Sequence, residues 1–330
     1  MNFDRARAVA DAVLFEGYAL YPYRATSTKN QLRWQFGVLA PRAASERSGA
    51  DPWWLEAQLV ADGDRGARVA GRLRFLRLRR RRVETARGEA IASLEVDGRL
   101  LIPWDEGEPS EHDFALALDG GATTLPIELA GDRIDEPVRD AAGALVARVV
   151  RTRAPLSLRI HVAAEPLGRC ARVRVRVENL SPCAEPDAAR DALLLRATVG
   201  THLMLAIEGG AFVSLLDPPD WAAAPAAECR NVGVYPVLAA EPGRHDLVLA
   251  SPIIMYDHPA VAPESPGDLF DATEIDEILT LRTLMLTDEE KRAARATDPR
   301  VAALIDRVDG LAPEALARLH GVLREPTRQG

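Results

Sequence analysis

The clearest candidates for chemistry are a histidine and the acidic residues around it. Asp257 and His258 stand together in the sequence Tyr-Asp-His-Pro, and Ser265 follows a few residues later. An Asp–His pair can activate a serine hydroxyl as a nucleophile. Ser265, however, precedes a proline and lacks the G-x-S-x-G turn that exposes such a nucleophile. A hydrogen-bonded loop histidine is favoured; the alternative is a hydrolase or metal-dependent enzyme that uses the Asp257/His258 and Asp268/Asp271 region.

Carboxylates gather just after this pair. The cluster consists of Asp268, Asp271, Glu274, Asp276 and Glu277. Asp271, Glu274 and Glu277 have the three-residue spacing that places side chains on one face of a helix. Such a face can hold magnesium or calcium, but no EF-hand spacing accompanies it. Acids are also favoured in a first helical turn by the helix dipole. We therefore predict a helix start whose acids, at Asp268, Asp271, Glu274 and Glu277, face a protein partner.

Histidines and cysteines do not form a metal-binding pattern in the sequence. The three cysteines have no C-x-x-C spacing, which predicts free and mostly buried thiols. None of the six histidines forms an H-x-x-x-H pair. His202 lies in an apolar strand, so we expect a hydrogen-bonded core histidine. The sequence thus predicts no metal, no cofactor and no catalytic residue.

An arginine-rich strand runs from Arg72 to Arg82. Alternation would place Arg77, Arg79 and Arg81 on one face. Such a row can follow a phosphate backbone, or it can pair with acids on neighbouring strands. The flanks lack aromatic residues for base stacking, and the net charge is -8. We predict no nucleic-acid binding and favour paired arginines or a contact with an acidic protein surface.

The segment from residue 18 to residue 34 combines aromatic and cationic side chains. Tyrosine, tryptophan and arginine dominate the energetic centres of protein interfaces. The alternative is that the aromatic side chains are core and the cations lie at its rim. We predict a partner-binding surface made of Tyr18, Tyr21, Tyr23, Arg24, Lys29, Arg33 and Trp34.

The elements that must position these residues are mostly strands. Residues 4–15 have helical spacing, and Gly17 ends that helix. Residues 171–177 alternate valine with arginine, which indicates one buried and one wet strand face. Helix signals return from about Asp271 onward. We predict a mainly β fold of sandwich-like or barrel-like antiparallel sheets, with a short N-terminal helix and an α-helical C-terminal tail. The predicted units are a β-rich domain at 1–150, a second β-sandwich-like domain at 151–260 and an acidic helical tail at 261–330.

The first residues carry acid early, and the apolar stretch that follows is interrupted by Glu16. Neither a signal peptide nor a transmembrane helix fits this pattern. A cytoplasmic protein without membrane insertion is therefore expected.

Two long strings carry a family resemblance. They are VLFEGYALYPYRATSTKNQLRWQFGVL at 13–39 and SPGDLFDATEIDEILTLRTLMLTDEEKRAARATDPR at 265–300, with SLLDPPDWA and SPIIMYDHPAVAPESPGDLF between them. The sequence resembles an uncharacterised bacterial family encoded beside actinobacterial-type nickel-iron hydrogenase and its maturation genes. The resemblance implies an accessory role, with hydrogenase subunits or maturation factors as partners. Because the paired cysteines of metal carriers are lacking, that role would be scaffolding or chaperoning.

Overall fold

The computed structural model describes residues 2–16, 36–260 and 287–295, together with residues 302, 305, 306, 309 and 310. Among these residues, no helix is both long enough and apolar enough to cross a membrane. The fold is mainly β, as predicted, and it begins with a short helix. Of the predicted helical tail, the described residues include α7 (Asp288–Arg295), and most of the rest lies outside them.

One very long strand organises the sheet. β1 (Trp54–Thr85) covers 32 residues, and it joins residues 55–61 and 69–83, whose sequence predicts two separate strands with a break between them. Its partners are all antiparallel. They are β10 (Cys170–Asn179), β11 (Thr198–Phe212), β5 (Trp104–Ala117), β8 (Leu145–Arg153) and the short β2 (Ala90–Ile91). The register with β11 shifts between Gly63 and Arg68, so an irregularity replaces the predicted break.

The eleven-stranded sheet has the main order β12-β13-β11-β1-β10-β9-β6, with β8 and then β7 branching from β1. The remaining members are β12 (Tyr235–Leu238), β13 (Leu247–Ser251), β9 (Leu156–Leu167), β6 (Gly121–Leu129) and β7 (Asp132–Arg139). A separate hairpin pairs β3 (Leu94–Val96) with β4 (Arg99–Leu101). The predicted domain boundary at residue 150 falls inside β8, and strands from both sides of it share this one sheet.

The curled sheet encloses its largest apolar cluster along one face. Val173, Val175 and Val177 are fully buried there, together with Leu73 and Phe75 of β1. The intervening arginines of β10 lie on the other face, so the alternation in the sequence is confirmed. Burial of the valine face stabilises the strand pairing, because each buried valine contributes about 1.5 kcal/mol or more.

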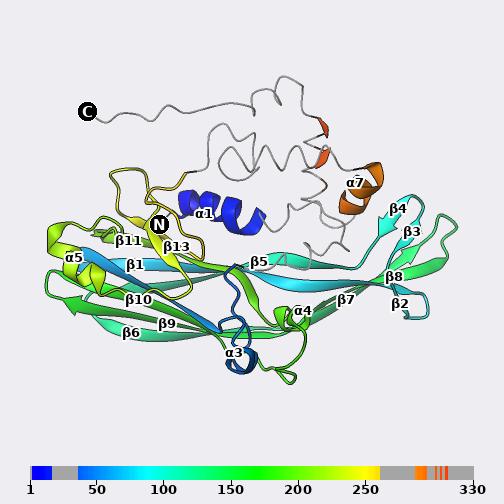
Figure 1. Cartoon of the computed structure of the whole chain (residues 1–330), viewed down its shortest axis with the longest axis horizontal. Helices are drawn as coiled ribbons and strands as arrows, with labels where there is room; N and C mark the ends of the chain where they lie inside the picture. Colours follow the sequence, from blue (N-terminus) through cyan, green and yellow to red (C-terminus); the bar gives the residue numbers. More distant parts are fainter. Residues whose placement is uncertain are drawn as a thin grey trace.

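The opposite face of the sheet is covered by the N-terminal helix (Figure 1). α1 (Asp4–Ala10) continues directly as a π-helical segment, η1 (Asp11–Glu16), which matches the predicted helix. Val9, Leu14 and Phe15 pack there against side chains of β1, β11 and β13. Further short helices are α3 (Arg42–Ser48), α4 (Arg190–Leu194) and α5 (Asp220–Ala227).

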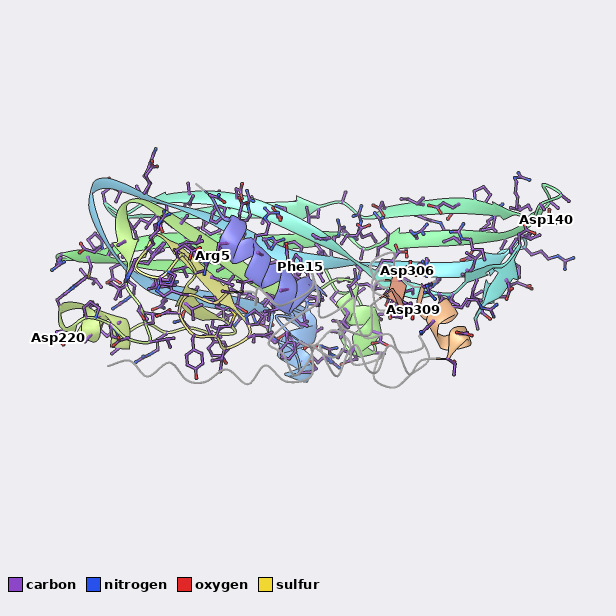
Figure 2. The ribbon with its side chains drawn as sticks, turned by 90° about the horizontal axis from the view of Figure 1, so that it is seen from above. Arg5, Phe15, Asp140, Asp220, Asp306 and Asp309 are labelled. Carbon is purple, nitrogen blue, oxygen red and sulfur yellow. The ribbon has the colours of Figure 1, made fainter. Side chains whose placement is uncertain are left out.

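The molecule is elongated along the strands. Figure 2 shows Asp140, at the β7–β8 turn, at one end of the molecule and Asp220 of α5 at the other. Arg5 and Phe15 lie between them, on the helix that crosses the sheet. The arm formed by β7, β8 and the end of β1 has its own small apolar cluster, which includes Val83 and Val149. Between this cluster and the main core, the strands carry charged side chains.

Candidate functional site

The predicted partner-binding residues lie outside the part of the chain that the structure describes. They are Tyr18, Tyr21, Tyr23, Arg24, Lys29, Arg33, Trp34, Asp268, Asp271, Glu274 and Glu277. Their role stays a prediction. The described residues that flank them are the helix that ends at Glu16 and the loop that follows β13.

Asp257 and His258 are described, and both make hydrogen bonds within the fold. Asp257 accepts one hydrogen bond from the Ser214 hydroxyl, at 2.5 Å, and another from the backbone N–H of Leu238, at 2.7 Å. The His258 ring donates from Nδ1 to the carbonyl of Ala240, at 2.9 Å. The serine proton therefore points to the aspartate, while the imidazole is held by another segment.

These contacts close one edge of the sheet. Leu238 belongs to β12, which pairs with β13 on one side only. The N–H of Leu238 binds Asp257, and its carbonyl accepts the N–H of His258 at 2.6 Å. Both groups would otherwise be available to an added strand. His258 has a left-handed φ of 59°, a conformation that histidine tolerates better than most residues.

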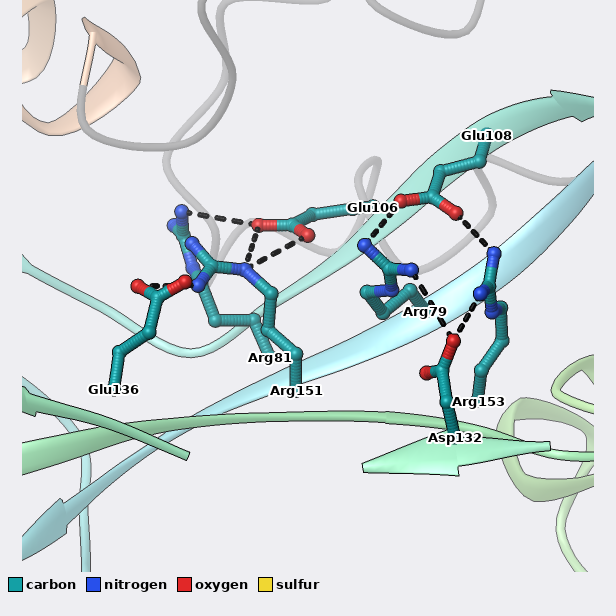
Figure 3. A network of polar contacts seen from close by, with 8 residues as sticks. All are labelled: Arg79, Arg81, Glu106, Glu108, Asp132, Glu136, Arg151 and Arg153. Carbon is teal, nitrogen blue, oxygen red and sulfur yellow. Dashed lines mark hydrogen bonds and ion pairs between the residues drawn. The ribbon is translucent and has the colours of Figure 1, made fainter. Parts of the chain in front are cut away.

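The arginine row is paired with acids on neighbouring strands, as one of the two predicted arrangements requires. Arg79 binds Glu108 at 2.5 Å, and Arg153 of β8 binds the other oxygen of Glu108 at 2.6 Å. Both arginines also contact Asp132 of β7. Figure 3 shows Glu108 and Asp132 lying between the two guanidinium groups. A carboxylate from β5 thus joins β1 to β8 where these strands separate.

A second set of charged residues has the same arrangement and lies two residues farther along β1, toward the arm. Glu106 lies between Arg81, at 3.4 Å, and Arg151, at 3.2 Å (Figure 3). Arg151 also binds Glu136 of β7 at 2.7 Å. We call the eight residues of both sets the ionic network. It takes the place of apolar packing between the two hydrophobic clusters, and it fixes the register of four strands.

Arg77 completes the row, and among the described residues it has no carboxylate within ion-pair distance. It is 6% exposed, and one of its Nη atoms donates to the carbonyls of Ala130, at 2.6 Å, and Ala154, at 2.5 Å. These carbonyls belong to the residues that directly follow β6 and β8, so the guanidinium joins the β6–β7 and β8–β9 connections. Burial lowers the pKa of Arg77, and the nearby charge of Arg153 adds to that effect.

His202 is a core histidine, as the sequence indicates. It is fully buried, and its Nδ1 lies 2.7 Å from the carbonyl of Gly200. Because a carbonyl only accepts, Nδ1 carries the proton and Nε2 is the acceptor for Arg74, at 3.4 Å. Burial lowers the pKa of His202 to about 3.

Arg74 is the link between this buried histidine and the N-terminal helix. It is 2% exposed and binds Asp11 at 2.7 Å and Glu111 at 2.8 Å. Its guanidinium also lies 4.7 Å from the centre of the Phe15 ring. The helix is therefore attached to the sheet by a charged contact as well as by apolar packing.

The cysteines are free thiols in this structure: Cys170 is buried, and Cys183 and Cys229 are partly buried. Burial raises the pKa of both the Cys170 and the Cys229 thiol, which favours the protonated form. Within the described ranges, no group of three or more histidine, cysteine or acidic residues is placed to hold a metal ion.

Sequence reasoning missed the acids that pair with the arginine row. Glu106 and Glu108 alternate on β5, and that period of two was a usable signal once a neighbouring strand was expected. β7, which supplies Asp132 and Glu136, was not predicted because its side chains are mostly exposed.

Comparison with known proteins places no further constraint on the site: no protein-family model and no curated protein matches this sequence.

Proposed function

We propose that this chain is a non-enzymatic accessory protein for the assembly or maturation of a nickel-iron hydrogenase, acting by protein–protein interaction. The structural observation that favours a binding role over the enzyme alternative is that Asp257 and His258 are engaged in hydrogen bonds within the fold. Their hydrogen bonds close the edge of β12 and hold a loop in place. The hydrogenase partner is supported by the sequence resemblance at 13–39 and 265–300.

A rigid base for a binding segment is the second support. α1 and η1 are fixed to β1 through Arg74 and Asp11, and η1 ends at Glu16, directly before the aromatic and cationic segment. A segment that leaves a fixed helix loses less conformational freedom on binding than one attached to a mobile end. The sheet would thus present the segment while the partner supplies the acidic or apolar surface that it contacts.

A deletion strain of the native host tests the proposal. We expect deletion to lower hydrogenase activity and the amount of mature hydrogenase, and the wild-type chain to restore both. The double variant Tyr18→Ala/Trp34→Ala should restore neither, because it removes two aromatic anchors from the predicted surface. The matched control is Arg87→Glu, an exposed residue of the turn that follows β1. Unchanged hydrogenase activity in the deletion strain would contradict the proposal.

A further inference from the structure

A row of hydrogen-bonded side chains crosses three strands on the outer face of the sheet. β6, β9 and β10 lie side by side, and Thr124 of β6 is the register partner of His161 of β9 (Figure 1). The Thr124 hydroxyl lies 3.0 Å from His161 Nδ1, and a carboxylate oxygen of Glu178 on β10 lies 3.2 Å from His161 Nε2. A hydroxyl, an imidazole and a carboxylate in this order can activate the hydroxyl as a nucleophile.

The acid fixes where the protons lie in this row. Glu178 is 9% exposed and also accepts a hydrogen bond from Arg176 Nε, at 2.8 Å. Burial acts to raise the pKa of Glu178, but hydrogen bonds from Arg176 and His161 outweigh it and lower that pKa below its ordinary value. The ionised carboxylate only accepts, so His161 Nε2 carries the proton. In the neutral ring Nδ1 is therefore the acceptor, and the Thr124 hydroxyl donates to it.

The hydroxyl end of the row is open to solvent, while its acidic end is closed. Thr124 is exposed, and the His161 side chain is 34% exposed. A small reactant can therefore reach the hydroxyl, and Glu178 holds the imidazole from the protein side. Thr123 gives a direct contrast. It is also exposed, but among the described residues its hydroxyl has no hydrogen-bond partner.

A cation stands beside the hydroxyl. Arg159 lies two residues from His161 on the same face of β9 and opposite Pro126, which makes it the diagonal neighbour of Thr124. Diagonal neighbours of an antiparallel pair are about 7–8 Å apart, within reach of a long side chain. Arg159 is exposed, and no acid of the described ranges lies within ion-pair distance of it. Its charge can stabilise the negative charge that develops on a carbonyl oxygen under attack.

We propose that Thr124 is a nucleophilic hydroxyl that accepts an acyl group from an activated ester, with His161 as its base. Thr124 Oγ bonds to the carbonyl carbon, and the bond from that carbon to the leaving oxygen breaks. The hydroxyl proton passes to His161 Nδ1 and then to the leaving oxygen. The products are an ester of Thr124 and a free alcohol or phenol, so no oxidant or reductant is required. Each chain takes up one acyl group, so this modification site goes beyond the proposed binding role without making the chain an enzyme.

The test uses p-nitrophenyl acetate, an activated ester, and the full-length chain. We expect a burst of about one equivalent of nitrophenol per chain. Mass spectrometry of the peptides should place the acetyl group on Thr124 and not on Thr123. Thr124→Val should lose this acetylation, and Thr124→Ser, which keeps a hydroxyl, should retain it. The matched control Thr123→Val should be acetylated at Thr124 at the wild-type rate.

The other members of the row predict graded effects on the acetylation rate of Thr124. His161→Gln should lower it about a hundredfold or more, because it removes the base. Added imidazole should restore part of the rate to His161→Gly, which a merely structural role would not allow. Glu178→Gln should lower the rate about tenfold or more, because the imidazole tautomer is no longer fixed, and Glu178→Asp should recover part of it. Arg159→Ala should slow acetylation, whereas Arg148→Ala, exposed on β8, should not.

Three results would overturn the proposal. They are the absence of an acetyl group on Thr124, equal acetylation of Thr123 and Thr124, and a rate that His161→Gln leaves unchanged. The comparison of the two threonines is made in the wild-type chain, so it stands even where a variant fails to fold. A deletion strain with normal hydrogenase activity would remove the proposed function and leave the acetylation result standing.

Discussion

Arg74, near the middle of the longest strand, donates to Asp11 in the N-terminal helical segment at 2.7 Å. The arginine is buried, whereas the aspartate side chain is one-third exposed. When the acid of such a contact is removed, the buried arginine charge is poorly compensated. Removal therefore lowers stability more than removal of one partner of a surface ion pair does.

The first prediction concerns this contact. Arg74→Ala should lower the free energy of unfolding by about 3 kcal/mol or more, since it removes the partner of Asp11, Glu111 and His202 together. Asp11→Ala should cost less, because Glu111 still pairs with Arg74. Urea unfolding measures both variants, with the exposed Arg82→Ala as the control, expected within about 0.5 kcal/mol of the wild type. Equal effects of Arg74→Ala and Arg82→Ala would contradict this prediction.

The second prediction is a pH dependence from His202. Its pKa in the folded protein is about 3, below the ordinary value of 6.5, so the folded state favours the neutral ring. Below pH 6.5 the unfolded chain takes up a proton that the folded chain does not. Stability from this residue is therefore lost as pH falls from 6.5 toward 3, at up to about 1.4 kcal/mol per pH unit.

His202→Gln isolates this contribution, because the carboxylates titrate in both proteins. The difference in unfolding free energy between wild type and variant should shrink from pH 6.5 to pH 4. Parallel curves over this range would show that His202 does not titrate on unfolding.

Arg77 gives the third prediction. Arg77→Ala removes the charged donor of the part-buried hydrogen bonds to the carbonyls of Ala130 and Ala154, and each hydrogen bond from a charged group contributes about 1.5 kcal/mol. We expect a loss of about 3 kcal/mol in urea unfolding, with Arg139→Ala at the exposed end of β7 as the control. A loss under about 1 kcal/mol would show that water replaces the guanidinium at these junctions.

The fourth prediction is a coupling within the ionic network. A double-mutant cycle of Arg153→Ala and Glu108→Ala should give a coupling energy of about 1 kcal/mol, above the median of exposed pairs, because the carboxylate is shared by two arginines. Their side chains are 23% and 33% exposed, so salt should weaken the coupling. The exposed pair Arg42/Glu46 is the matched control, and an equal coupling there would contradict a special role for the network.

The fifth prediction concerns the loop that closes β12. Asp257→Ala removes the acceptor for Leu238 and Ser214 and should cost about 1–2 kcal/mol. Asp257→Asn, which keeps one acceptor, should recover part of this loss. His258→Gly should be tolerated better than His258→Val, since a β-branched residue disfavours the positive φ at this position. The reverse order for the two His258 variants in thermal unfolding would contradict this reading.

The sequence predicts those strands whose two faces differ. On β10 the valines face the core and the arginines face water, so a period of two identifies the strand and its buried face. β7 fails this test because residues 132–139 are mostly exposed, and its place beside β8 depends on pairing that only the folded chain provides. The sequence also does not predict that β1 is one continuous strand. Gly63 and Gly66 indicate a turn at a point where the strand continues.

For the candidate site, residue types in the sequence indicate which side chains are of interest. They do not indicate the hydrogen-bond partners of those side chains. The sequence indicates that Asp257 and His258 are adjacent and that His202 is buried, but Ser214, Ala240 and Arg74 come from distant strands and loops. Hydrogen bonds between such distant positions follow from tertiary register, which no local pattern encodes.

The most direct test of the hydrogenase role is quantitative mass spectrometry of the full-length chain purified through a tag from its native host. A hydrogenase subunit or maturation protein should be enriched over an untagged control, and the Tyr18→Ala/Trp34→Ala variant should lose that enrichment while Arg87→Glu retains it. Enrichment of neither class of protein by the wild-type chain would contradict the role proposed here.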